Sequence, residues 1–447
     1  MQAVSTFYIW RLTWPTILSN MIFMLMGIAF LKIAGTFGSD EVAAATTGHR
    51  LVFVVQAIVM GLCSGTTAMV GMHWGAGNKK IAGRFAALSL LIFSFDGIII
   101  SWIPIPFLQQ IIGFFGLTAE AQTLAIDFTF WTFVFAPAMM TSLILNMSFR
   151  AIGDSLTPLW ISSISIGSAI LLAAALSIGW GAVPSLGLLG LAIGGGIAMS
   201  ISTAIFIILW IFGCLSFKPY NPRPHIMADG KTLVDIGMPA AFEQAIFQIG
   251  VIIFMAFLTT YGNAAFAAYG IALSILGLII VIAFSFSMSS ATLVSQYLGA
   301  GDHQGAYDAG WRTMRTSVYF MIVGALVIAL FAEQIARFMI DDDVVVGHMV
   351  TLTYILCLSL PLMGIEFSMA GALRGAGDTQ FPMRVTVFSI LVSRIAIPWI
   401  LVQIGADVFW LYALSILDFL IKSSLNIARF RSKTWLSETH KVPANIN

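Results

Sequence analysis

The chain is a succession of long apolar stretches separated by short polar connectors. Twelve stretches reach about twenty residues or more, the length that an α-helix needs to cross roughly 30 Å of hydrocarbon. Their apolarity is continuous and not alternating, which argues against the strands of a membrane barrel. The predicted spans are residues 9–36, 50–74, 86–108, 122–148, 159–181, 188–214, 233–260, 266–298, 314–336, 347–373, 382–404 and 408–428.

A second pattern is a repeat of polar and small residues at an offset of 224 residues, with no gap needed. Two copies of one six-span bundle predict a pseudo-twofold axis, with a cavity between the copies. The paired residues are Pro15 with Pro239, Gly38 with Gly262, Gly77 with Gly301, Pro137 with Pro361, and Arg150, Gly153, Asp154 and Pro158 with Arg374, Gly377, Asp378 and Pro382.

The number of spans sets the relation between the copies. Six spans return the chain to its starting side, so the second copy runs parallel to the first, about an axis along the membrane normal. We therefore expect an all-α membrane protein with an N-terminal lobe at 1–215, a polar, proline-rich cytoplasmic linker at 216–230 and a C-terminal lobe at 231–447.

Composition and charge support a membrane location. Hydrophobic residues make up 59% and charged residues 9% of the chain, against about 25% charged in a typical soluble domain. With the N-terminus inside, 17 of the 21 Lys and Arg residues fall on the cytoplasmic side. By the positive-inside rule, both termini are cytoplasmic and the location is the inner (plasma) membrane. A net charge of +1 gives no basic footprint for nucleic acid.

Several motifs together resemble one transporter family. They are Leu-Arg-Gly-Ala-Gly-Asp-Thr at 373–379, its twin Phe-Arg-Ala-Ile-Gly-Asp-Ser at 149–155, and Met-Pro-Ala-Ala-Phe-Glu-Gln at 238–244. In this order and spacing they resemble the MATE (multidrug and toxic compound extrusion) transporters. The resemblance implies a V-shaped pair of lobes, with proton- or sodium-driven export of bulky, often cationic, compounds by alternating access. A lipid-embedded monomer is expected.

The two Arg-x-x-Gly-Asp loops are interpreted as structural. Each glycine can take a positive φ, each aspartate can cap the following helix, and each arginine can bond helix-end carbonyls or lipid headgroups. This interpretation keeps the loops out of the transport site. The residues concerned are Arg150, Gly153 and Asp154 in the first copy and Arg374, Gly377 and Asp378 in the second.

Ionisable side chains inside spans are candidates for function, because each costs about 2.5–3.5 kcal/mol at the bilayer centre on insertion scales. Asp418 and Lys422 are four residues apart and are expected to neutralise each other. Arg394 fits a recurrent arginine of the family and is expected to bond carbonyls or an acid. The remaining candidates are Asp96, Glu243 and Glu366.

Glu243 is the strongest of these candidates. It lies about one turn beyond Pro239, which leaves a backbone carbonyl unpaired. An apolar setting disfavours the charged carboxyl, so Glu243 could exchange a proton or bind an organic cation when ionised. The resemblance places a cavity-facing carboxylate here, with Gln244, Phe247 and Gln248 beside it. The alternative role is to fix helix packing through hydrogen bonds.

Glu366 and Asp96 are further ion-coupling candidates. The resemblance places span 10, which carries Glu366, on the same cavity as Glu243, so the pair could share protons. Many bacterial members carry an aspartate in span 1 where this chain has Phe30. Asp96 in span 3 either replaces that acid or bonds a neighbouring helix.

Other side chains of spans 1 and 7 complete the expected substrate-binding set. Most Phe and Met residues are expected to contact lipid. Met26, Phe30 and Phe254 lie in spans 1 and 7, the first span of each lobe, and are expected to line the cavity. Lys32 could reach the outer headgroups or pair with an acid across the cavity.

These observations predict a secondary active exporter that antiports organic cations against H⁺ or Na⁺. Protons are favoured, because a sodium site needs several converging oxygens. The alternative is a flippase for lipid-linked oligosaccharide or peptidoglycan precursors, which should have several basic cavity residues where only Lys32 and Arg394 are available. A channel or receptor fits less well, and enzymatic activity is not expected. No cofactor and no bound metal are expected, and the lack of a phosphate-binding loop argues against ATP hydrolysis.

Overall fold

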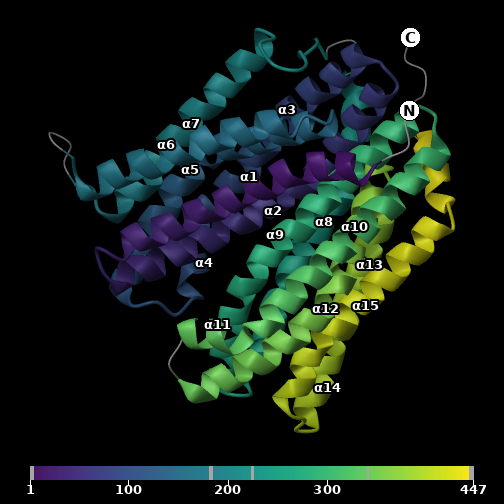
Figure 1. The fold of residues 1–447 in the computed structure, drawn as a ribbon. Coiled ribbons are helices and arrows are strands. Elements are labelled where there is room, and N and C mark those ends of the chain that lie inside the picture. The colour runs from purple at the N-terminus through teal and green to yellow at the C-terminus, as the bar shows by residue number, and fades with distance from the viewer. Residues whose placement is uncertain (1–4, 181–184, 223–225, 340–341, 442–447) are drawn as a thin grey trace. The chain divides into compact units, whose positions relative to one another are not determined.

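The computed structural model describes residues 5–180, 185–222, 226–339 and 342–441, and these contain helices and no strand (Figure 1). Within them, twelve helices are long and apolar enough to cross a membrane. The prediction of an all-α protein with twelve spans is therefore confirmed.

The helices of the first half are α1 (Thr6–Ala34), α2 (Ser39–Gly75), α3 (Lys79–Trp102), the short η1 (Ile105–Phe107) and α4 (Leu108–Gly113), α5 (Ala119–Ala151), α6 (Leu156–Ile178) and α7 (Leu188–Ile211). Those of the second half are α8 (Ile226–Thr259), α9 (Asn263–Gly299), α10 (His303–Leu330), α11 (Ala332–Met339), α12 (Asp343–Gly375), α13 (Gln380–Ile390), η3 (Leu391–Ala396), α14 (Ile397–Gln403), α15 (Val408–Arg431) and η4 (Thr434–Lys441).

Several helices differ from the predicted spans. α2 begins at Ser39 instead of residue 50, and α10 begins at His303 instead of residue 314. Hydropathy detects only the apolar part of a helix, whereas backbone hydrogen bonding continues through polar end turns. The predicted span 86–108 is broken after Trp102, because Pro104 and Pro106 lack the amide hydrogens that a continuous helix needs.

The chain forms two compact units. The N-unit is Trp14–Asp235, and the C-unit is Ile236–Asn447 together with Met1–Thr13. The stretch predicted as a linker packs on the N-unit: the Tyr220 amide donates to the Gly83 carbonyl (3.4 Å). Arg84 Nε also lies 2.9 Å from Asp229 Oδ2 in the first turn of α8. The start of α8 is thereby tied to the N-unit, although most of this helix belongs to the C-unit.

The internal repeat extends to the backbone of the Arg-x-x-Gly-Asp loops. Gly153 and Gly377 have φ of 88° and 85°, which confirms the predicted positive φ at both positions. Asp154 caps α6 as predicted, since its Oδ1 accepts from the Thr157 amide at 3.0 Å. The same prediction for Asp378 is wrong. The first turn of α13 has no side-chain cap, and Asp378 Oδ2 accepts from Arg429 Nε at 2.8 Å.

The C-unit depends on close contact between α9 and α12, which pack along much of their length (Figure 1). A Cβ atom at Gly371 would collide with the Ser287 carbonyl oxygen, and one at Gly375 with the Ala291 carbonyl oxygen. Both pairs are four residues apart, the small-xxx-small spacing that lets membrane helices approach closely. This approach brings Arg374, which lies between the two glycines in sequence, close to α9.

Replacing Gly371 with leucine is expected to destabilise the C-unit, because overpacking of this kind typically costs about 1–3 kcal/mol. The thermal midpoint in detergent, followed by size-exclusion fluorescence, should fall. Gly324→Leu is the matched control, because a Cβ atom at Gly324 would meet nothing within 4 Å. Equal midpoints for the two variants would contradict the close packing of α9 and α12.

Candidate functional site

The Glu243 carboxylate is held by two elements of the C-unit. Arg374 Nη2 lies 2.7 Å from Oε1 and Arg374 Nε lies 3.3 Å from Oε2, so the pair is bidentate. The Thr386 hydroxyl donates to Oε1 at 3.1 Å. Glu243 is only 4% exposed. Its burial agrees with the choice of Glu243 as a candidate, and its negative charge is balanced within the protein.

The interpretation of Arg374 as a residue that bonds helix-end carbonyls or headgroups is wrong. Its guanidinium points into the C-unit, where it contacts Glu243 and, at 3.5 Å, the Ser287 hydroxyl of α9. In the first copy Ser19 occupies the position that corresponds to Glu243, so Arg150 has no equivalent ion pair with a glutamate there.

A second buried cluster surrounds Asp418 on α15. Its carboxylate accepts from the Ser389 hydroxyl at 2.6 Å and from Arg394 Nη2 at 3.2 Å, and the Lys422 ammonium lies 3.1 Å away. Asp418 is fully buried, and Lys422 is 3% exposed. The predicted Asp418–Lys422 pair is confirmed, and Arg394 bonds an acid, one of the two alternatives open for it. Its Nη1 also donates to the Tyr269 hydroxyl at 3.2 Å.

The helix that carries Arg394 is irregular at that point. Span 11 runs as α13, then as the π-helical segment η3 (Leu391–Ala396), and then as α14. The corresponding span of the first copy, α6, is one uninterrupted helix. π-Helical turns are rare and occur frequently at functional sites. The irregularity thus coincides with the charged cluster around Asp418, and the corresponding described helix of the first copy has neither the π-helical segment nor these charges.

Glu366 on α12 differs from the other two buried acids. It is 7% exposed, and among the described residues no guanidinium or ammonium lies within ion-pairing distance of it. Lys422 and Arg374 are the cations that act on it electrostatically, and Glu243 and Asp418 are the acids. We call these six residues the charged network: the acids are Glu243, Glu366 and Asp418, and the bases are Arg374, Arg394 and Lys422. Its net charge is zero when Glu366 is ionised and +1 when Glu366 carries a proton.

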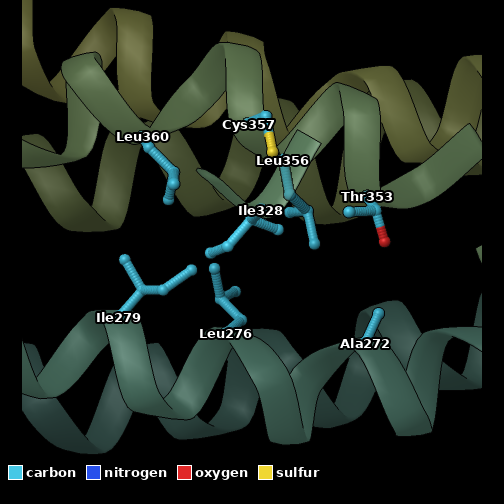
Figure 2. Close-up of a pocket in the computed structure, with 8 residues that line it drawn as sticks. All are labelled: Ala272, Leu276, Ile279, Ile328, Thr353, Leu356, Cys357 and Leu360. Carbon is cyan, nitrogen blue, oxygen red and sulfur yellow. The ribbon is translucent and has the colours of Figure 1, made fainter. Parts of the chain in front are cut away.

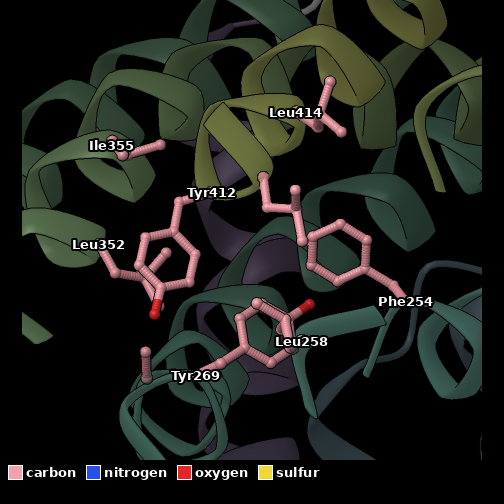
Figure 3. Close-up of a cluster of buried hydrophobic side chains, with 9 residues drawn as sticks. Phe254, Leu258, Tyr269, Leu352, Ile355, Tyr412 and Leu414 are labelled. Carbon is pink, nitrogen blue, oxygen red and sulfur yellow. The ribbon is translucent and has the colours of Figure 1, made fainter. Parts of the chain in front are cut away.

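An apolar cluster borders the network next to Arg394. The Arg394 guanidinium lies over the Phe254 ring, 4.7 Å from its centroid, and donates to the Tyr269 hydroxyl. Figure 3 shows Phe254 and Tyr269 among the side chains of this cluster. Tyr261 packs against the edge of this cluster, where burial and the neighbouring Asp407 carboxylate raise the pKa of its hydroxyl. The buried members are Phe254, Leu258, Tyr269, Ala272, Leu352, Ile355, Leu411, Tyr412 and Leu414.

The structure brings together part of the expected substrate-binding set. Phe247 lies beneath the Lys422 ammonium, 5.2 Å from its ring centroid, and Gln244 and Gln248 are partly buried on the same helix. Phe254 is fully buried under Arg394. Phe247 and Phe254 therefore contact cations of the C-unit network, and Gln244 and Gln248 lie on the same helix.

The expected residues of the N-unit lie in a different setting. Phe30 is 6% exposed and stacks on His49, with ring centroids 6.1 Å apart, and Met26 is 5% exposed. Asp96 on α3 is half-buried. Lys32 is exposed in the last turn of α1, and neither Asp96 nor Lys32 forms an ion pair with any described residue. The N-unit thus has no counterpart of the C-unit network in the described part of the chain.

The site contains residues that the sequence analysis did not select: Arg374, Thr386, Ser389 and Tyr269. One signal was available, because Thr386, Ser389 and Ser393 recur at helical spacing in an otherwise apolar span. Such spacing predicts a polar face turned toward a partner helix.

A separate small hollow lies between α9, α10 and α12 (Figure 2). Its lining has no ionisable group except the Cys357 thiol, and Thr353 supplies a hydroxyl. A space without charged side chains has no means of exchanging protons or holding an ion. We therefore place the functional site at the charged network and not in this hollow.

Comparison with known families gives a match over most of the chain. The sequence model of the MatE family matches twice, over residues 15–175 and 239–400. The two matches begin at Pro15 and Pro239, the first pair of the internal repeat.

Curated relatives are similar along most of their length. The probable multidrug resistance protein NorM of Thermotoga maritima is 25% identical over 433 residues, covering 95% of this chain and 92% of the relative. A multidrug resistance protein NorM of Burkholderia vietnamiensis is 25% identical, covering 85% and 83%. A FAD transporter of Shewanella oneidensis is 24% identical, covering 78% of each chain.

Solved structures have the same fold. The eukaryotic MATE transporter AtDTX14 superposes with a TM-score of 0.87 at 17% identity, covering 98% of this chain and 97% of that one. A MOP superfamily transporter from Pyrococcus furiosus, described as having a binding pocket of reverse polarity, gives a TM-score of 0.85 at 19% identity, with coverage of 95% and 96%.

Proposed function

Because this chain belongs to the MATE family of multi-pass membrane transporters, we propose that it is a secondary active exporter that moves organic cations out of the cytoplasm in exchange for protons. The relatives named as multidrug resistance proteins support export of small organic compounds. The buried charges of the C-unit support the choice of coupling ion and of cargo charge.

The observation that carries the proposal is the position of Glu366. It is a buried carboxylate without an ion pair among the described residues, in a network that is neutral only when this carboxylate is ionised. One proton on Glu366 changes the net charge of this network by one. At an effective dielectric constant of about 20, a charge roughly 6 Å away contributes about 3 kcal/mol. Protonation can therefore expel a bound organic cation.

The proposed cycle uses this competition. In the outward-facing state Glu366 takes up a proton, with Glu243 as the second carboxylate of the site, and the cation is released outside. The protein then closes outward and opens inward. Loss of the proton to the cytoplasm restores the negative charge, and a new cation binds. A ligand shifts such an equilibrium only through its different affinity for the two states, and the single unit of charge supplies that difference.

Protons fit the network better than sodium. The oxygens of Glu243 and Asp418 are already engaged by guanidinium, ammonium and hydroxyl donors. A hard metal cation needs several free oxygens that converge. The same engagement weighs against the flippase alternative, because Arg374, Arg394 and Lys422 are bound to carboxylates and do not form a free basic lining.

The proposal includes the orientation in the membrane. We place both termini in the cytoplasm, because most Lys and Arg residues then lie on the cytoplasmic side. The proposed setting is the inner (plasma) membrane, with the protein acting as a monomer.

The test uses everted membrane vesicles that contain the protein and are energised to an acid interior. Ethidium, tetraphenylphosphonium and FAD are added separately, with and without sodium, while a fluorescent dye reports the interior pH. Alkalinisation on addition of either organic cation, independent of sodium, is the expected result. Vesicles without the protein provide the baseline.

The other outcomes distinguish the alternatives. A response that requires sodium would replace proton by sodium coupling. A response to FAD alone would indicate an anionic cargo like that named for the Shewanella oneidensis relative. No response to any compound from folded protein would reject the proposed exporter and favour the flippase.

A further inference from the structure

Lys422 occupies an unusual place for an ammonium group. It lies in the membrane-spanning helix α15 and is almost completely buried. It is close to both oxygens of Asp418, at 3.1 and 3.2 Å, and it lies over the ring of Phe247 on α8. Because Asp418 also accepts from Arg394 and Ser389, its charge remains compensated without Lys422. The pair with Asp418 therefore does not by itself account for a buried lysine.

The packing of α12 on α15 brings Lys422 near a second acid. Met363 and Phe367, which lie on either side of Glu366 in sequence, belong to or pack against a cluster that contains Phe419 of α15. Lys422 lies within one turn of Phe419, and its ammonium is 5.9 Å from that ring. Lys422 is also a cation that acts electrostatically on the Glu366 carboxyl.

The internal repeat separates this feature from the common scaffold. At the positions that correspond to Arg394, Asp418 and Lys422, the first copy has Ile170, Gly194 and Ala198. The first copy also lacks the π-helical segment. A fold of this kind thus forms without these charges, so their presence in the second copy is not a requirement of the helix packing.

We propose that the Lys422 ammonium is a tethered counter-cation for Glu366, which balances that carboxylate when its proton has left. Lysine suits this role, because its charge is compact and its flexible stem carries three donors. The functional consequence of this role rests on the proposed exporter cycle. In that cycle Lys422 is a positioning residue: it keeps the deprotonated state accessible, so that Glu366 can release its proton to the cytoplasm.

The charged groups that act electrostatically on Glu366 come from three helices. Glu243 comes from α8, Arg374 from its own helix α12, and Asp418 and Lys422 from α15. Arg394 of η3 contacts Asp418 and the Tyr269 hydroxyl of α9, and neither Arg394 nor Tyr269 is among the groups that act on Glu366. Arg374 is bound bidentately to Glu243. Lys422, which is paired with Asp418, is the other cation that acts on Glu366.

The test measures the protonation of Glu366 directly on the purified full chain. The infrared stretching band of a protonated carboxyl group is followed against pH, and the band that is missing in Glu366→Gln is assigned to Glu366. The infrared midpoint is the pH at which this band has half of its full height. In Lys422→Met the pH at half height should rise by about one unit or more, a tenfold change in proton affinity. Lys422→Arg should return it toward the wild-type value. Asp418→Asn should move it in the opposite direction, because the network then has one negative charge fewer.

A purely structural role makes a different prediction. Lys422→Met would then lower the thermal midpoint while the infrared midpoint stayed at the wild-type value, and this result would overturn the inference. If Lys422→Met does not fold, the polar variant Lys422→Gln replaces it, and an infrared midpoint at the wild-type value in that variant overturns the inference equally. Transport by the wild type in everted vesicles is scored separately, so a failed exporter assay with a shifted infrared band rejects the proposed function alone.

Discussion

Replacing Glu366 with glutamine is expected to lower cation-driven proton movement by about 100-fold or more. Glutamine keeps the size and hydrogen bonding of the side chain but neither ionises nor takes up a proton. One charge at a distance of roughly 6 Å contributes about 3 kcal/mol, which corresponds to roughly a hundredfold change in the affinity for the cation. The measurement is the initial rate of interior alkalinisation in everted vesicles on addition of ethidium, with protein abundance matched by immunoblot.

Glu333→Gln is the matched control for this experiment. The same chemical change then falls on α11, where the Glu333 side chain is 62% exposed and pairs with Arg337, and exchange should stay near the wild-type rate. Exchange that persists in Glu366→Gln but is lost in Glu243→Gln would assign the proton to Glu243. That result would mean that the Arg374–Glu243 pair opens during the cycle.

Replacing Arg374 with methionine is expected to destabilise the protein by about 3–5 kcal/mol, the usual cost of leaving one member of a buried ion pair without its partner. The side chains of Arg374 and Glu243 are 12% and 5% exposed, so water screens the remaining carboxylate only weakly. Stability is measured in detergent as the free energy of unfolding in a denaturant titration, or as the thermal midpoint where unfolding is irreversible.

The double variant Arg374→Met/Glu243→Gln separates the ion pair from general damage. It should recover most of the lost stability, because no uncompensated charge is left. Arg384→Met is the control, since Arg384 is exposed and bonds only the Gln380 side chain among the described residues. If the double variant is as unstable as Arg374→Met alone, the arginine acts through packing and not through its charge.

The sequence repeat is matched by the backbone of the Arg-x-x-Gly-Asp loops because single residues set the backbone conformation there. The glycines that end the helices, such as Gly153 and Gly377, need a positive φ that other residues rarely adopt. A sequence repeat therefore becomes a backbone repeat at these positions. The corresponding aspartates, Asp154 and Asp378, have different hydrogen-bond partners because their surroundings differ. Asp378 faces Arg429, whereas the corresponding residue in the first copy is Ile205.

The partners of the buried charges were less predictable. Asp418 and Lys422 lie one turn apart on a helix, so spacing alone predicted their pair. Arg374 and Glu243 are 131 residues apart, and no local pattern relates them. Their pairing depends on the tertiary contact between α12 and α8, two helices that are remote in the sequence. A sequence repeat suggested a loop role for Arg374, because it could not show the direction of the side chain.

The sequence by itself determined the membrane location, the twelve spans, the repeat and the burial of Glu243, since each follows from apolarity, helical period or residue type along a continuous stretch. Only the tertiary structure decided that Arg374 faces inward, that span 11 contains a π-helical turn, and that Glu366 is the buried acid of the C-unit without an ion pair among the described residues. These features depend on the distances between helices that are remote in sequence, and such distances are set by side-chain packing.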